Sequence, residues 1–325
     1  MTPRPHCELY VAACDKAGGI FRFAMTDEGK LTLLDMTPCD RPMYMAISGN
    51  TLFCLLRAPF EGTDESGLVT FAIGPDGRLT PQPGVATTHG NCACHLSLLE
   101  GAVYAVNYLS GSVVRLPDTL RVHTGHGPNP VRQEAAHTHM VTPTPDGYLV
   151  VADLGTDSLT VYDRDLRPLS SAKVPDGHGA RHVVFSHDGR FLFCVNELRS
   201  TVSVFAYERG TLTLLHTVPA LPEGEAGIGN TAAAIRLSHD GRYLYVSHRG
   251  LDMLTCFGVD GSTLTPLSYT PCGGKRPRDF DLIDGYAVCT NEGDHSVTVL
   301  KADGPRLTLV DRTENVPGAL CVLRR

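Results

Sequence analysis

The sequence contains no tryptophan, no cluster of lysine or arginine, and no run of eighteen apolar residues. The missing apolar run excludes a membrane-spanning helix, and the N-terminal segment MTPRPHCELY lacks the apolar stretch of a signal peptide. The net charge is −7, which argues against nucleic acids and anionic membranes, because both require clustered positive charge. We therefore expect a cytoplasmic protein that binds neither nucleic acid nor membrane and acts on a small molecule.

Several common catalytic and cofactor motifs are missing as well. There is no Gly-x-Ser-x-Gly segment, which disfavours a serine esterase. The segment NCACH is one residue short of the Cys-x-x-Cys-His haem motif. His137 and His139 could begin a metal site, but no set of carboxylates accompanies them. The sequence therefore predicts no cofactor and no metal.

The eleven cysteines are an odd number, and most lie inside apolar runs such as TLFCLL and YAVC. A free thiol in such a run behaves as a small buried hydrophobic group. We expect reduced core cysteines rather than disulfides.

A repeated pattern of short strands extends along the chain. The segment ARHVVFSHDGRFLFCVNE (180–197) has two alternating apolar runs joined by Asp-Gly, a strong hairpin signal because both turn residues tolerate positive φ. Related segments cover 139–162 and 234–257, and weaker ones cover 95–116 and 279–300. A third and a fourth strand follow each hairpin, and the turns recur about every 42 to 52 residues, as in four-stranded propeller blades.

The repeat count predicts an all-β, seven-bladed β-propeller that forms a single domain over residues 1–325. Six complete units follow from Tyr44 onward, three strands precede them, and one strand, GALCVLRR, is left at the end. Pairing this last strand with the first three completes a seventh blade and leaves no open sheet edge. The absence of tryptophan excludes the WD and kelch signatures.

Polar residues gather at one end of each predicted hairpin, where the first strand begins and the second ends. Both ends lie on the same face of the disc, so we expect these residues from several blades to meet there. The strand-start residues are His95, His139, Arg181, His182, Arg276 and Arg278. The strand-end residues are Arg57, Asn107, Asp153, Asn196, Glu197, His248, Arg249, Asn291 and Glu292. Arginines, histidines, amides and carboxylates together suit a small anionic, oxygen-rich ligand.

At HTHM, ARH, VNE and SHR the sequence resembles the lactonase family of seven-bladed β-propellers, which includes 6-phosphogluconolactonases and 3-carboxy-cis,cis-muconate lactonizing enzymes. The resemblance covers nearly the whole chain. It implies four catalytic residues, namely His139, Arg181, Glu197 and Arg249. It also implies surrounding substrate-binding residues, namely His95, Asn107, His182, Asn196 and Arg278. The chain departs from the family pattern at His248, usually Asn or Asp, and at Ala234, often acidic.

The resemblance implies a lactonase that hydrolyses a sugar-acid lactone, with 6-phosphogluconolactone as the first candidate substrate. Glu197 would deprotonate water, Arg181 and Arg249 would stabilise the oxyanion, and His139 would protonate the ring oxygen. An exchange of roles that makes His139 the base is left open. The alternatives are a carboxy-muconate cycloisomerase and a non-catalytic binding propeller.

Overall fold

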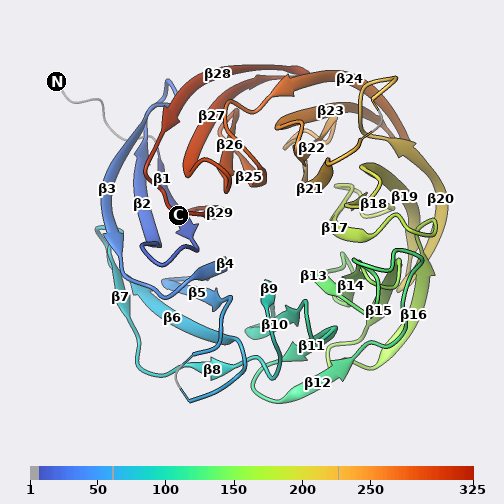
Figure 1. Ribbon diagram of the computed structural model, residues 1–325, viewed down its shortest axis with the longest axis horizontal. Coiled ribbons are helices and arrows are strands. Elements are labelled where there is room, and N and C mark those ends of the chain that lie inside the picture. Colours follow the sequence, from blue (N-terminus) through green and yellow to red (C-terminus); the bar gives the residue numbers. More distant parts are fainter. Residues whose placement is uncertain (1–6, 61, 226) are drawn as a thin grey trace.

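The computed structural model describes residues 7–60, 62–225 and 227–325, and β-strands are the regular secondary structure of these residues. The strands form seven antiparallel sheets around a central axis, which confirms the predicted seven-bladed β-propeller (Figure 1). Within the described residues, no helix has the length and apolar character needed to cross a membrane.

The blades are numbered here along the chain, and each runs from the centre of the ring outward. Blade 1 contains β4 (Pro42–Ser48), β5 (Thr51–Leu56), β6 (Gly67–Ile73), β7 (Leu79–Pro81) and the short β8 (Ala86–Thr87). Blade 2 contains β9 (Ala93–Leu99), β10 (Ala102–Asn107), β11 (Ser112–Arg115) and β12 (Thr119–Val122). Blade 3 contains β13 (Thr138–Pro143), β14 (Leu149–Asp153), β15 (Ser158–Tyr162) and β16 (Pro168–Lys173). Blade 4 contains β17 (Ala180–Phe185), β18 (Phe191–Asn196), β19 (Thr201–Glu208) and β20 (Thr211–Pro219).

The remaining three blades complete the ring. Blade 5 contains β21 (Thr231–Leu237), β22 (Tyr243–Arg249), β23 (Met253–Asp260) and β24 (Thr263–Pro271). Blade 6 contains β25 (Pro277–Ile283), β26 (Tyr286–Asn291), β27 (Ser296–Asp303) and β28 (Arg306–Thr313). Blade 7 contains β29 (Ala319–Arg324), β1 (Cys7–Ala13), β2 (Gly19–Met25) and β3 (Leu31–Thr37). The last strand pairs with the first one, so the ring closes as the sequence predicts.

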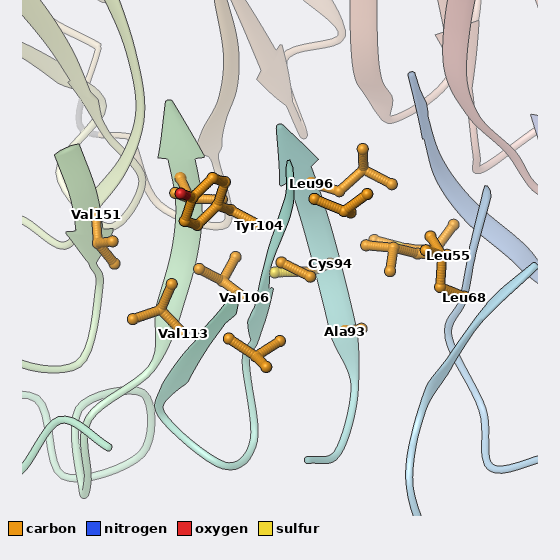
Figure 2. Close-up of a cluster of buried hydrophobic side chains, with 14 of the residues drawn as sticks. Leu55, Leu68, Ala93, Cys94, Leu96, Tyr104, Val106, Val113 and Val151 are labelled. Carbon is orange, nitrogen blue, oxygen red and sulfur yellow. The ribbon is translucent and has the colours of Figure 1, made fainter. Parts of the chain in front are cut away.

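The core consists of apolar side chains packed between neighbouring blades. In one cluster, Leu55 and Leu68 of blade 1 lie on one side of Cys94 and Val106 of blade 2, and Val151 of blade 3 lies on the other side (Figure 2). Similar clusters lie along the rest of the ring, including both sides of blade 7. All eleven cysteines are free and most are buried, as expected.

The Asp-Gly turns form hairpins, although not with the two-residue turn that the pattern favours. In the turn after β17, only Gly189 has a positive φ, of 71°. The Asp188 carboxylate accepts hydrogen bonds from the Ser186 hydroxyl and the Arg190 amide. The side chain of the aspartate therefore stabilises a longer loop, and the glycine alone supplies the left-handed residue.

Each innermost strand has a break in register near its beginning. In blade 4, Ala180 lies opposite Asn196 and His182 lies opposite Val195, so Arg181 is an extra, bulged residue. The corresponding bulged residues in blades 1, 2, 3, 6 and 7 are Met43, Cys94, His139, Arg278 and Leu320, and in blade 5 the break lies between Ala232 and Ile235. Bulges redirect side chains. We call this end of the ring, where innermost strands begin and second strands end, the mouth.

Candidate active site

Glu197 is the centre of a buried, charged cluster at the mouth. It directly follows β18, and its amide donates a 2.8 Å hydrogen bond to the Gly179 carbonyl, just before β17. Its Oε2 atom lies 2.9 Å from Arg181 Nε and 2.9 Å from Arg249 Nη2, and its Oε1 atom lies 2.6 Å from Arg132 Nη2. Glu197 is only 2% exposed. Three guanidinium groups therefore surround one carboxylate away from bulk water.

The backbone of blade 5 holds the two buried arginines in place. Arg181 Nη1 donates a 2.6 Å hydrogen bond to the Ala233 carbonyl, and Arg249 Nη2 donates a 3.1 Å bond to the Ala232 carbonyl. Both alanines are fully buried, and Ala233 lies in the register break, where blade 4 carries its bulged arginine. Their small side chains leave room for Arg181 to extend toward the neighbouring blade.

Burial and charge together set the ionisation of this cluster. Burial by itself raises the pKa of a carboxyl, but Arg249 and Arg181 outweigh it and hold the pKa of Glu197 well below its ordinary value. Burial, with the neighbouring charge of Arg249, lowers the pKa of Arg181 to about 9. Both groups are therefore charged at neutral pH.

Three histidines, His95 on β9, His139 on β13 and His182 on β17, lie beside one another at the centre of the ring. The His182 ring centroid lies 5.3 Å from that of His139 and 5.5 Å from that of His95. Burial, reinforced by nearby arginines, lowers all three pKa values, that of His95 to about 3, so the rings are neutral at physiological pH. Both nitrogens of His95 and the Nδ1 atoms of His139 and His182 are buried without a hydrogen-bond partner among the described residues. Such unpaired polar atoms indicate a place for water or a ligand.

Two residues outside the predicted set complete the cluster. Arg132 lies between β12 and β13, and its Nη2 atom is 3.3 Å from the Tyr108 hydroxyl. The Tyr108 ring stacks on His137 at 4.5 Å and lies 5.6 Å from His139. Tyr108 directly follows β10, as Glu197 follows β18, so the strand-end pattern extended by one residue would include it. Arg132 lies in an irregular segment that has no periodic signal.

The side-chain amides of the predicted asparagines bond to nearby strands and loops of the propeller. The amide of Asn107 donates to the Thr88 carbonyl at 2.9 Å and to the Ser112 hydroxyl at 3.0 Å. Asn196 donates in the same way to Thr201 and Ser203. Because both amide hydrogens are occupied, the geometry gives these residues a structural role: each ties the second strand to the third, and Asn107 also ties it to the segment before β9. A Ser or Thr five residues after each Asn is the sequence signal for this role.

Two other predicted residues also lie outside the Glu197 cluster. His248 contacts Asn230 and Thr255 through its ring nitrogens at 3.2 Å each, so it joins strands as the asparagines do. Arg278 lies on blade 6, and its Nη1 atom is 3.5 Å from Glu292 Oε2. Its charge still contributes to the lowered pKa values of Arg181 and His139. Arg278 is therefore close enough to influence the cluster without contacting Glu197.

Two cavities of about 740 and 790 Å³ lie away from this cluster. The first, lined by residues that include Leu198, Val218 and Tyr269, lies between blades 4 and 5 and has no comparable group of buried charges. The second lies toward the opposite end of blades 5 and 6, where Arg236 and the other arginines already pair with aspartates. No three histidine, cysteine or acidic side chains within the described ranges are arranged to hold a metal ion. The unpaired nitrogens and the buried carboxylate make the mouth the better candidate.

Comparison with known proteins agrees with the propeller fold. The chain matches the family described as "Lactonase, 7-bladed beta-propeller" over residues 8–324. An uncharacterised Lactococcus lactis protein is 36% identical over 318 residues, which cover 90% of each chain. An uncharacterised Staphylococcus saprophyticus protein is 33% identical over 332 residues, which cover 94% of each chain.

Solved structures of similar proteins have the same fold. The periplasmic gluconolactonase of Pseudomonas aeruginosa superposes with a TM-score of 0.89 at 27% identity, covering 98% of both chains. A Bacteroides fragilis protein provisionally named a 6-phosphogluconolactonase has a TM-score of 0.89 at 26% identity, covering 100% of this chain and 99% of its own. The chain belongs to the lactonase family of seven-bladed β-propellers.

Proposed function

We propose that the protein hydrolyses a sugar-acid lactone without a metal ion, with 6-phosphogluconolactone as the first candidate substrate. The observation that carries this proposal is the buried Glu197 carboxylate, which holds Arg181 and Arg249 beside neutral His139, whose Nδ1 atom has no hydrogen-bond partner among the described residues. Membership of the lactonase family and the similarity to a gluconolactonase support it.

The reaction needs a base for water, positive charge for the oxyanion, and a proton for the leaving ring oxygen. In this proposal the lactone carbonyl lies against Arg181 and Arg249, whose guanidinium groups stabilise the negative charge. His139 accepts a proton from the attacking water. The same proton then passes to the ring oxygen as the C–O bond of the tetrahedral intermediate breaks, so His139 ends neutral.

Glu197 has a different part in this mechanism. Its two carboxylate oxygens are both held by guanidinium groups, whereas the Nδ1 atom of His139 is buried without a hydrogen-bond partner among the described residues and is free to accept a proton. We therefore assign Glu197 to positioning the arginines, and we assign proton transfer to His139. Of the two role assignments that the sequence leaves open, this is the one with His139 as the base.

The arginines at the mouth also suit a carboxylated muconate, so a cycloisomerase is the second candidate function. We propose the cytoplasm as the location, although the Pseudomonas aeruginosa relative is periplasmic. A small anionic lactone is the proposed partner.

A pH-stat assay with freshly prepared 6-phosphogluconolactone and gluconolactone tests the function. The wild type, His139→Gln and Glu197→Gln are compared after EDTA treatment, with His187→Gln, an exposed histidine on a turn, as the control. We expect fast acid release by the wild type and the control, and a loss of about 100-fold or more in His139→Gln. Thermal denaturation identifies variants that fail to fold.

Acid release that disappears with EDTA would contradict a metal-independent reaction. Full activity of folded His139→Gln would overturn the assignment of the base. If neither lactone is hydrolysed above background, carboxymuconate becomes the next substrate, and failure there as well would leave a non-catalytic binding propeller.

A further inference from the structure

The mouth contains a second arginine–glutamate pair in the same register as the first. Arg278 is the bulged residue of β25, as Arg181 is of β17, and Glu292 directly follows β26, as Glu197 follows β18. Arg57, which follows β5 in blade 1, and Arg276, just before β25, also approach Glu292. We call these four residues the Glu292 group. Blade 7 lies across the ring from β17, and blades 6 and 1 lie on either side of blade 7 (Figure 1).

The Glu292 group is loosely held, unlike the cluster around Glu197. The distances from Glu292 to Arg278, Arg276 and Arg57 are 3.5, 3.9 and 4.0 Å, against 2.6 to 2.9 Å around Glu197. None of its three guanidinium groups donates a hydrogen bond to an oxygen atom of the described residues, and Glu292 Oε2 is buried without a hydrogen-bond partner among them. Arg57 also interacts with the thiols of Cys14 and Cys92. The donors of Arg276 and Arg278, and those of Arg57 that do not face these thiols, are therefore available to a ligand.

The charge of the Glu292 group points to a dianion. Three arginines face one glutamate, which leaves a surplus of two positive charges on this side of the mouth. The Nε atom of Arg249, which is 6% exposed and contributes to the low pKa of Glu292, is also buried and unpaired. This links the Glu292 group with the Glu197 cluster.

We propose that Arg57, Arg276 and Arg278 bind a doubly charged phosphate ester at the end of the substrate that is farthest from the lactone carbonyl. The inference rests on the proposed lactonase function, because it assumes that the carbonyl lies at Arg181 and Arg249. Planar guanidinium forks match phosphate oxygens, and hydrogen bonds between charged groups are among the strongest in proteins. Binding at both ends orients a small substrate across the mouth.

The test compares phosphorylated and unphosphorylated substrates. Steady-state constants for 6-phosphogluconolactone and gluconolactone are measured for the wild type, Arg57→Gln and Arg276→Gln. Both arginines are partly exposed, so their replacement does not threaten the fold. Arg312→Gln is the control, because Arg312 is paired with Asp294 and Glu314 on the outer side of blade 6. We expect kcat/KM for the phosphorylated lactone to fall about 10- to 100-fold, mainly through KM, and the value for gluconolactone to fall less than about threefold.

Equal losses with both lactones, or no loss with either, would overturn the subsite. A preference of the wild type for carboxymuconolactone over 6-phosphogluconolactone, lost in both variants, would overturn the phosphate assignment in favour of carboxylates. If the wild type hydrolyses neither lactone, the proposed function fails, and calorimetry with 6-phosphogluconate and gluconate tests the subsite separately. Binding that requires the phosphate and is lost in Arg57→Gln supports the subsite, and equal or absent binding of the two acids overturns it.

Discussion

Arg181 and Glu197 form a buried ion pair, and each depends on the other for its solvation. Arg181→Met removes one of the positive charges that stabilise the buried Glu197 carboxylate. Glu197→Met removes the negative charge between Arg181 and Arg249. We expect each variant to lower the free energy of unfolding by about 3–5 kcal/mol. The double variant should lose less than the sum of the two. Urea denaturation of the four proteins measures this coupling.

The exposed pair of Arg190 and Asp188 is a suitable control for this cycle. The distance between Arg190 Nε and Asp188 Oδ2 is 2.6 Å, similar to that in the buried pair, but both side chains are exposed to water. Arg190→Met should cost less than about 1 kcal/mol. Strictly additive losses in the Arg181 and Glu197 cycle would show that the two residues do not stabilise each other.

For single residues, the sequence predicted which ones lie at the mouth better than it predicted where their side chains point. The polar residues at strand starts and strand ends indicated Arg181, Glu197 and Arg249, and the structure brings these three into contact. The same pattern indicated Asn196, whose side chain instead bonds within its blade, because successive residues of a strand point to opposite sides. The strand pattern did not indicate Arg132, because this residue lies in an irregular segment between β12 and β13.

Strand β29 closes the ring, because its pairing with β1 joins the C-terminal end of the chain to the N-terminal strands. Val322, which is 3% exposed, lies opposite Val11 and packs between blades. Val322→Asp should therefore cost more than about 3 kcal/mol, because it buries an unpaired charge in the seam. Urea denaturation and size-exclusion chromatography would show a less stable and more aggregated protein.

Leu33→Asp is the matched control, because Leu33 lies on the outer strand β3 and is 51% exposed. We expect it to change the free energy of unfolding by less than about 1 kcal/mol. If Val322→Asp were as harmless as this control, the closure would not contribute to stability.

The strands were predictable because their signals are local. Alternating apolar residues and Asp-Gly pairs mark each hairpin, and the unpaired last strand identified the closure. The extra short strand β8, which pairs with β6 over only two residues, had no such signal. The Asp-Gly pairs also gave no indication that the aspartate side chain, rather than its backbone, shapes the turn.

For the whole molecule, buried neutral histidines make stability depend on pH. Burial lowers the pKa values of His95, His139, His182 and His248 in the folded state. Below about pH 6.5 the unfolded chain therefore binds protons that the folded ring does not, and stability falls as pH decreases. Each histidine contributes up to about 1.4 kcal/mol per pH unit in that range.

Urea denaturation at pH 7.5, 6.5 and 5.5 measures this dependence. We expect His95→Phe to show a shallower decline than the wild type, because one proton-binding group is missing from the unfolded chain. His187→Gln, at an exposed turn position, is the comparison variant. A free energy of unfolding that stays constant down to pH 5.5 would mean that the buried rings are protonated in the folded protein.

The register break shared by the innermost strands bears on how such a protein can change during evolution. The ladder of hydrogen bonds is interrupted at the same height around the ring, and the residue at the break is Met, Cys, His, Arg or Leu depending on the blade. The pairing of the sheets therefore does not dictate which side chain stands there. Mutation of the bulged residues can therefore change the chemistry of the mouth while the propeller fold is retained.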